Sequence, residues 1–174
     1  MKAMVFVSGV HGVGKSFFCD MVKKAIGIES YSASKLIEHK KHATFSQDKL
    51  IPDIDDNQPY LLQAVNELKE SGVNFILDGH FCLLNSSGKI TRISLDTFQA
   101  LNPDAILLLL EKPDVITARR KERDGIDVSV QSIHDFQQEE CSYAKEVAAN
   151  IGAKLFISYG KEDLSNAIAF LKTV

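Results

Sequence analysis

The sequence predicts an α/β fold in which helices cover a parallel central sheet. Continuous apolar runs, the pattern of strands buried on both faces, occur at 3–8, 74–78, 105–111 and 154–158. A weaker strand-like run lies at 28–32. Helical segments separate these runs, and this alternation is typical of parallel sheets with right-handed crossovers.

The helices are predicted from periodicity and from the residues at their ends. The glycine-rich turn after the first strand opens one helix, and a proline in the first turn followed by a glycine just past the end marks two others. Ser129 or Ser132 is the candidate N-cap of a longer helix. The predicted helices cover 15–26, 59–71, 113–123, 129–150 and 163–171.

Two stretches depart from this alternation. Residues 81–93 alternate in polarity around a Ser-Ser-Gly turn, which predicts a small β-hairpin added after the third main strand. Residues 119–129 are dense in charge with a glycine in the middle, which makes them a candidate mobile lid. No repeat, low-complexity tract or linker divides the chain, so we expect one domain over residues 1–174.

The composition excludes several classes of protein. A net charge of −3 and a pI near 5.9 provide no basic field for nucleic acid, so such a partner is not expected. Cys19, Cys82 and Cys141 form no CxxC pair, which argues against a disulfide framework or zinc ribbon and favours a reducing compartment. The apolar run 105–110 is too short to span a membrane. We expect a cytoplasmic protein, and the sequence does not indicate its oligomeric state.

The stretch GVHGVGKS fits the phosphate-binding pattern G-x-x-x-x-G-K-[ST], with a strand before it and a helix after it. In this pattern the backbone N–H groups and the helix N-terminus face the phosphates, Lys15 reaches the β- and γ-phosphates, and the Ser16 hydroxyl binds Mg²⁺. We therefore expect a nucleoside triphosphate bound with magnesium. The predicted nucleotide-binding residues are Gly9, His11, Gly12, Val13, Gly14, Lys15, Ser16 and Phe17.

Two further features complete a phosphate site. Asp78 ends a buried strand, where a carboxylate assists the magnesium ion; the alternative is a turn former or helix cap. Arg119 and Arg123 are four residues apart on one helix and share a face able to cover a phosphoryl group, whereas Arg120 points elsewhere. The alternative for this cluster is a solvated, charge-balanced helix end.

Together these motifs resemble the P-loop nucleoside-monophosphate kinases, specifically the small adenylate-kinase-like group. GVHGVGKS is similar to the phosphate loop of that group and DGH at 78–80 to its strand-end aspartate. The run LNPDAILLLLEKPDVITARRKERD at 101–124 resembles its fourth strand and arginine-bearing lid, and AKLFIS at 153–158 its last strand. The resemblance implies a three-layer α/β/α fold with a five-stranded parallel sheet of order 2-3-1-4-5.

The resemblance also implies roles for individual residues. Lys15 would neutralise the phosphates of ATP, Ser16 and Asp78 would hold Mg²⁺, and Arg119 and Arg123 would close as a lid. Ser158, Tyr159 and Gly160, at the end of the last strand, would lie beside the adenine; the alternative for the Tyr159 ring is plain packing.

The acceptor region departs from the resemblance. Its segment, about 32–63, begins Ser-Ala-Ser-Lys, and no arginine precedes Arg92, although these kinases hold the acceptor monophosphate with an arginine. Lysines in this segment supply point charges without the bidentate fork. The candidate acceptor-binding residues are Ser34, His80 and Arg92.

The sequence predicts a phosphotransferase that moves the γ-phosphoryl of Mg·ATP to a small-molecule acceptor. The overall resemblance favours a nucleoside monophosphate, whereas the missing arginine favours a nucleoside or another hydroxyl compound. The alternative from another class is a P-loop ATPase that acts as a nucleotide-dependent switch. Phosphorylation of nucleic-acid ends is disfavoured by the acidic pI.

Overall fold

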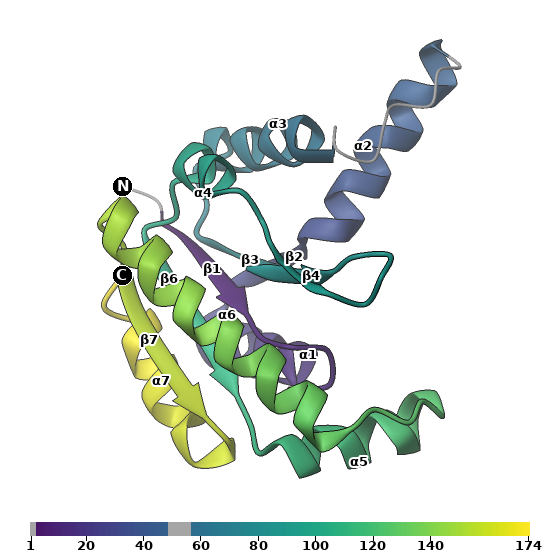
Figure 1. Cartoon of the computed structure of the whole chain (residues 1–174). Helices are drawn as coiled ribbons and strands as arrows, with labels where there is room; N and C mark the ends of the chain where they lie inside the picture. The colour runs from purple at the N-terminus through teal and green to yellow at the C-terminus, as the bar shows by residue number, and fades with distance from the viewer. Residues whose placement is uncertain (1–2, 49–56) are drawn as a thin grey trace.

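The computed structural model describes residues 3–48 and 57–174 and has the α/β architecture that the sequence predicts (Figure 1). Its five-stranded parallel sheet has the order β2-β3-β1-β6-β7. When the five sheet strands alone are numbered along the chain, this is the predicted order 2-3-1-4-5. The labels differ because β4 and β5 belong to a separate hairpin. The sheet strands are β1 Met4–Ser8, β2 Glu29–Ser32, β3 Phe75–Gly79, β6 Ala105–Leu110 and β7 Lys154–Tyr159.

The central strands are buried on both faces because each face packs against its own layer of helices. Met4 and Phe6 of β1 join one apolar core with α3 Asn57–Glu70, α4 Leu95–Leu101 and α6 Val130–Ile151. Val5 and Val7 of the same strand join a second core with α1 Lys15–Ile26 and α7 Leu164–Leu171. The result is the three-layer α/β/α arrangement, and the uninterrupted apolar runs are its sequence signature.

The predicted hairpin is present as β4 Cys82–Leu84 paired with β5 Ile90–Arg92. Helix α5 Pro113–Asp124 ends at Gly125, which adopts the left-handed conformation with φ 66° as its C-cap. Ser129, rather than Ser132, is the N-cap of α6, since its hydroxyl accepts the Ser132 N–H.

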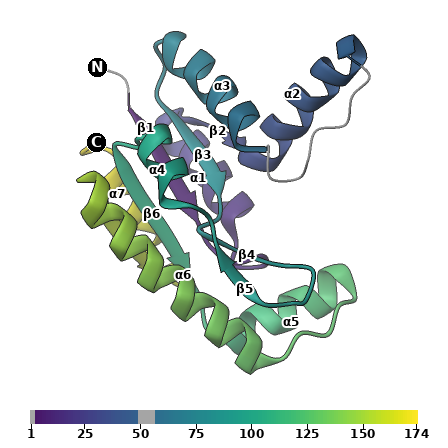
Figure 2. The same cartoon turned by 45° about the horizontal axis from the view of Figure 1, so that its top comes forward.

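The acceptor segment has more helix than the sequence predicts. Helix α2 Ala33–Asp48, which was not predicted, packs against α3, so that the two helices lie side by side (Figure 2). The part of this segment at 49–56 lies outside the described residues. Across the described ranges, no helix is both long and apolar enough to span a membrane.

The carboxyl ends of the parallel strands lie at one edge of the sheet. In the register, Ser8 is opposite Gly79 in the β1–β3 pair and Leu110 is opposite Tyr159 in the β6–β7 pair. The glycine loop therefore begins beside the segment that follows Asp78, and this edge is where ligands bind in open α/β sheets.

Candidate active site

The glycine loop has the backbone conformation that its sequence requires. Gly12 and Gly14 have φ values of 92° and 107°, which other residues rarely adopt, and α1 begins directly at Lys15. A Cβ atom on Gly12 would lie 2.9 Å from Cγ of Arg120. Gly14 is thus needed for its backbone conformation, and Gly12 for its conformation and because a side chain there would collide with Arg120.

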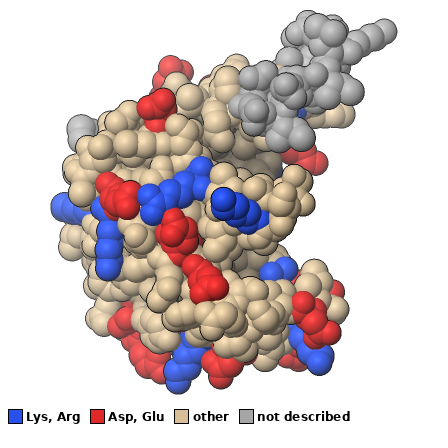
Figure 3. Space-filling view, viewed as in Figure 1, with Lys and Arg blue, Asp and Glu red and all other residues tan. Residues whose placement is uncertain are grey.

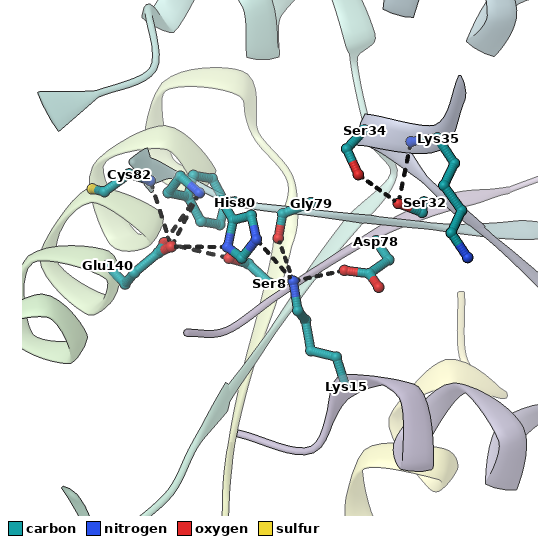
Figure 4. Close-up of polar contacts among 11 residues, drawn as sticks. Ser8, Lys15, Ser32, Ser34, Lys35, Asp78, Gly79, His80, Cys82 and Glu140 are labelled. Atoms are coloured by element: carbon teal, nitrogen blue, oxygen red, sulfur yellow. Dashed lines mark hydrogen bonds and ion pairs between the residues drawn. The ribbon is translucent and has the colours of Figure 1, made fainter. Parts of the chain in front are cut away.

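Lys15 is held by the end of β3. Its Nζ atom lies 2.7 Å from Oδ1 of Asp78, donates to the Gly79 carbonyl at 3.1 Å, and lies 3.4 Å from Nε2 of His80 (Figure 4). The Lys15 side chain is only 12% exposed. Its ammonium group therefore sits at the boundary between the loop and the neighbouring strand end, where a bound phosphate would compete with Asp78 for it.

Ser16 and Asp78 line the same cavity, which begins at the glycine loop. A hydroxyl and a carboxylate are the hard oxygen donors that Mg²⁺ takes from proteins, usually one or two per ion with phosphate oxygens and water as the rest. No group of three or more His, Cys, Asp or Glu side chains gathers as a metal site among residues 3–48 and 57–174. The two-residue donor set fits a magnesium ion that arrives with a nucleotide.

The arginines of α5 lie on two sides. Arg119 donates from Nη1 to the Val13 carbonyl at 3.1 Å, and its Nη2 lies 3.6 Å from a Glu111 carboxylate oxygen. Arg123 lines the cavities on both sides of the loop and has no hydrogen-bond or ion-pair partner within the described part of the chain. Arg120 instead faces a third hollow. Arg119 and Arg123 therefore both lie by the glycine loop. Arg120 also packs against Gly12, and its buried Nε has no hydrogen-bond partner among the described residues.

His11 and Phe17 occupy different positions around the loop. Nε2 of His11 lies 3.1 Å from Oδ2 of Asp124, so this side chain links the loop to the end of α5. Phe17 is 56% exposed and lines the cavities on both sides of the loop. Gly9 leaves no room for a larger residue at the start of the loop, because a Cβ there would lie 2.6 Å from a Val13 side-chain carbon.

A smaller cavity of about 220 Å³ lies between the glycine loop and the end of β7. Ser158 and Gly160, which were expected beside the adenine, line it, whereas Tyr159 is not among its lining residues. Successive residues of a strand face opposite sides: Ser158 is 1% exposed and Tyr159 is 45% exposed. The Ser158 hydroxyl has no hydrogen-bond partner among the described residues, so it is free to contact a ligand.

A larger cavity of about 430 Å³ extends from the glycine loop toward α2, α3, β4 and α4. Ser34 and His80 line it, at the positions expected for acceptor-binding residues. A third hollow of about 550 Å³ lies between the hairpin and the α5–α6 region, and Figure 3 shows the surface indented there.

Arg92 does not line this larger cavity, which corrects its expected role. Its guanidinium forms ion pairs with Glu139 and with Glu146, at 2.9 Å for the latter, both on α6. The same guanidinium lies 4.7 Å from the ring centroid of Tyr143. These partners hold Arg92 against α6, and it is not among the residues that line the larger cavity.

Glu140 is a site residue that the sequence reasoning missed. This fully buried carboxylate of α6 accepts the Phe81 N–H at 3.1 Å and the Ser8 hydroxyl at 3.3 Å (Figure 4). It thereby ties the last residue before the glycine loop to the segment that follows Asp78. Nδ1 of His80 lies 3.8 Å from Glu140. A charged residue on the apolar stripe of a predicted helix was the signal that could have found it.

Burial shifts the pKa values of Glu140 and His80 in opposite directions. Burial raises the pKa of Glu140 from 4.5 to about 7, despite the N–H groups that stabilise its charge. Burial, followed by the positive charge of Lys15, lowers the pKa of His80 from 6.5 to about 4. His80 is therefore neutral at physiological pH, and its Nε2 can accept a hydrogen bond from the Lys15 ammonium while Nδ1–H faces Glu140.

We expect Glu140→Gln to stabilise the protein increasingly as the pH rises. Between pH 4.5 and 7 the native state keeps a proton that unfolded Glu140 loses, so this group makes the free energy of unfolding fall with rising pH. Glutamine removes that dependence. The difference in Tm, variant minus wild type, should increase by several degrees from pH 5 to pH 8, since 1 kcal/mol shifts Tm by about 2–4 °C in such a domain. A difference that stays constant with pH would contradict the assignment.

The fold and the site define the class of this protein. The GVHGVGKS loop lies between a central strand of the parallel sheet and a helix, and it has a strand-end aspartate and arginines close to it. This arrangement is typical of a P-loop protein of the kinase type. The chain belongs to the AAA domain family, whose sequence model matches residues 8–137.

Solved structures with the same fold include two proteins named as kinases. An unliganded sugar kinase from Janibacter sp. HTCC2649 is 19% identical, with a TM-score of 0.58 over 99% of this chain and 94% of that one. A gluconokinase from Sinorhizobium meliloti 1021 is 16% identical, with a TM-score of 0.54 over 96% and 87%. An uncharacterised protein from Eubacterium ventriosum ATCC 27560 is 13% identical, with a TM-score of 0.56 over 99% and 97%. No curated protein sequence matches this chain significantly.

Proposed function

We propose that this protein transfers the γ-phosphoryl group of Mg·ATP to a hydroxyl group of a small molecule. The observation that carries the proposal is that Lys15, Ser16 and Asp78 line the cavity of about 430 Å³ that continues between α2, α3 and α4. A phosphoryl group on the glycine loop would thus lie at the mouth of a space large enough for a second small molecule. The names of two structural neighbours, a sugar kinase and a gluconokinase, support this reaction class.

In the proposed reaction the acceptor oxygen attacks the γ-phosphorus in line with the bond to the β–γ bridging oxygen. The new O–P bond forms as the bridging bond breaks, which leaves ADP and a phosphate monoester. Lys15 exchanges Asp78 for phosphate oxygens, and this frees the Asp78 carboxylate to take the proton of the attacking hydroxyl. A magnesium ion held by Ser16 and Asp78 would add charge neutralisation across the β- and γ-phosphates.

The α5 arginines would cover the transferring group. Arg119 already lies on the glycine loop, and Arg123 has a free guanidinium between the two cavities. Closure of α5 over the phosphates would exclude water and favour transfer over hydrolysis. The smaller cavity, with Ser158 and Gly160, is the proposed place of the nucleotide base.

The test is ADP formation from Mg·ATP over a panel of nucleosides, nucleoside monophosphates, sugars and small alcohols. We expect at least one acceptor to raise the rate of ADP formation at least tenfold above the rate with water alone. Equal rates with and without every acceptor would contradict the proposal. That result, together with a nucleotide-dependent protein complex on a sizing column, would favour the regulatory ATPase.

A further inference from the structure

The walls that β1, α2, α3 and α4 contribute to the larger cavity are largely apolar. Phe6 and Phe98 line it, each at most 2% exposed, with their ring centroids 5.5 Å apart in an edge-to-face arrangement. Leu61, Leu101 and Ile37, from three different helices, complete the wall. A flat apolar body can bury its faces here, whereas an acceptor with a hydroxyl on every carbon would leave most of them unpaired.

Among the described residues, this part of the cavity is lined by no Lys or Arg side chain that could pair with an anionic acceptor. Lys15 and Arg123 are the Lys and Arg side chains among the described residues that line the cavity, and both belong to its phosphate end. Lys35 and Lys41 face other hollows, and Lys40 is bound to Glu67 at 2.6 Å. A monophosphate or carboxylate buried here would lack the bidentate partner that such groups require.

Two amide side chains in the first turn of α3 carry oxygens that have no hydrogen-bond partner in the described part of the chain. Oδ1 of Asn57 and Oε1 of Gln58 are buried, line the cavity, and accept no hydrogen bond from any described residue. A buried polar atom left unpaired is unfavourable, because it has lost its hydrogen bonds to water. A ligand that donates N–H or O–H groups would satisfy both oxygens, and rotation of either amide would offer an NH₂ donor instead. These side chains therefore form a neutral polar edge beside the apolar side chains of the cavity.

We propose that the acceptor is an uncharged nucleoside, whose base lies between the apolar walls with its polar edge on Asn57 and Gln58. This inference rests on the proposed function and adds the acceptor class to it. The sugar hydroxyl would then point toward Lys15 and Asp78, and its oxygen would take the γ-phosphoryl group of ATP, giving a nucleoside monophosphate and ADP. Ser34, whose hydroxyl lies 3.0 Å from that of Ser32 near the cavity mouth, is placed to contact the sugar.

The experiment measures binding and turnover separately for adenosine, guanosine, cytidine and uridine and for their 5′-monophosphates. Binding is measured by calorimetry in the presence of Mg²⁺ and a non-hydrolysable ATP analogue, and turnover by ADP formation. We expect one or more nucleosides to bind at least tenfold more tightly than the matching monophosphates. Tighter binding of the monophosphates, or turnover with monophosphates alone, would overturn the inference and leave the phosphotransferase proposal standing.

Variants of the amide pair test the subsite directly. Asn57→Leu and Gln58→Leu should each raise the KM for the nucleoside about tenfold with less than a twofold change in kcat, because they remove binding far from the reacting atoms. Asn57→Asp and Gln58→Glu keep an oxygen acceptor and should retain nucleoside binding. Gln63→Leu, on the exposed side of the same helix, is the matched control. An unchanged KM in both leucine variants, with Tm preserved, would overturn the inference.

The two proposals fail in distinguishable ways. Nucleoside binding that the leucine variants weaken, without ADP formation, would uphold the subsite and contradict the phosphotransferase. Turnover of a sugar or simple alcohol with no binding of any nucleoside would uphold the phosphotransferase and overturn the subsite.

Discussion

Lys15→Ala is expected to lower kcat for phosphoryl transfer by roughly 10²–10³-fold, the cost of losing one preorganised donor at developing charge. The Lys15 side chain is largely buried, with its ammonium 2.7 Å from Asp78, and the glycine loop contains no other Lys or Arg that could take its place. Stopped-flow or coupled-assay measurement of ADP formation with the preferred acceptor gives the effect on kcat. A loss of less than tenfold would place the chemistry elsewhere.

The fold should survive this substitution. Lys15 lies at the first position of α1, where alanine is well tolerated, and Asp78 is 24% exposed and remains hydrated without its partner. Lys24→Ala, on the exposed face of the same helix, is the matched control and should leave both kcat and Tm near the wild-type values. A collapse of Tm in Lys15→Ala alone would show that the lysine has a structural role.

Asp78→Asn should have the second-largest effect, a fall in kcat of about 10²-fold or more, because it removes a magnesium ligand and the proposed proton acceptor together. It should also change the magnesium dependence of nucleotide binding. In the wild type, the Asp78 carboxylate repels the phosphates of magnesium-free ATP and competes with them for Lys15. The asparagine variant should therefore bind ATP in EDTA more tightly than the wild type does, and gain less affinity on addition of Mg²⁺.

Isothermal titration with ATP, in EDTA and then in excess Mg²⁺, measures this effect. Asp96→Asn, an exposed carboxylate on α4, is the control and should behave as the wild type does. Weaker binding of magnesium-free ATP by Asp78→Asn would contradict the competition between the carboxylate and the phosphates.

The parts of the site that the sequence predicts are local ones. The glycine loop and Asp78 each follow directly on a buried strand, and parallel pairing of those strands brings them together without further information. The ends of α5 and α6 were also predictable, because Gly125 and Ser129 act through their own backbone neighbourhoods. Helix α2 escaped prediction because its amphipathic pattern is weak.

The remaining parts depend on register and on competition between distant side chains. Whether Ser158 or Tyr159 faces the nucleotide side depends on a one-residue register in β7. Arg92 was expected near the substrate, but two carboxylates of α6, distant in sequence, hold it outside. Glu140 lies 132 residues from Ser8 along the chain, so no local pattern could indicate their contact.

The central claim is that the γ-phosphoryl group goes to an organic acceptor in the cavity beside Lys15 and Asp78. The most direct measurement follows the label from γ-labelled Mg·ATP into acceptor ester and into inorganic phosphate in the same reaction. The account predicts that, with a nucleoside present, most of the label appears in a phosphate ester, and that Lys15→Ala abolishes this product. Label recovered entirely as inorganic phosphate, at a rate no acceptor changes, would contradict it.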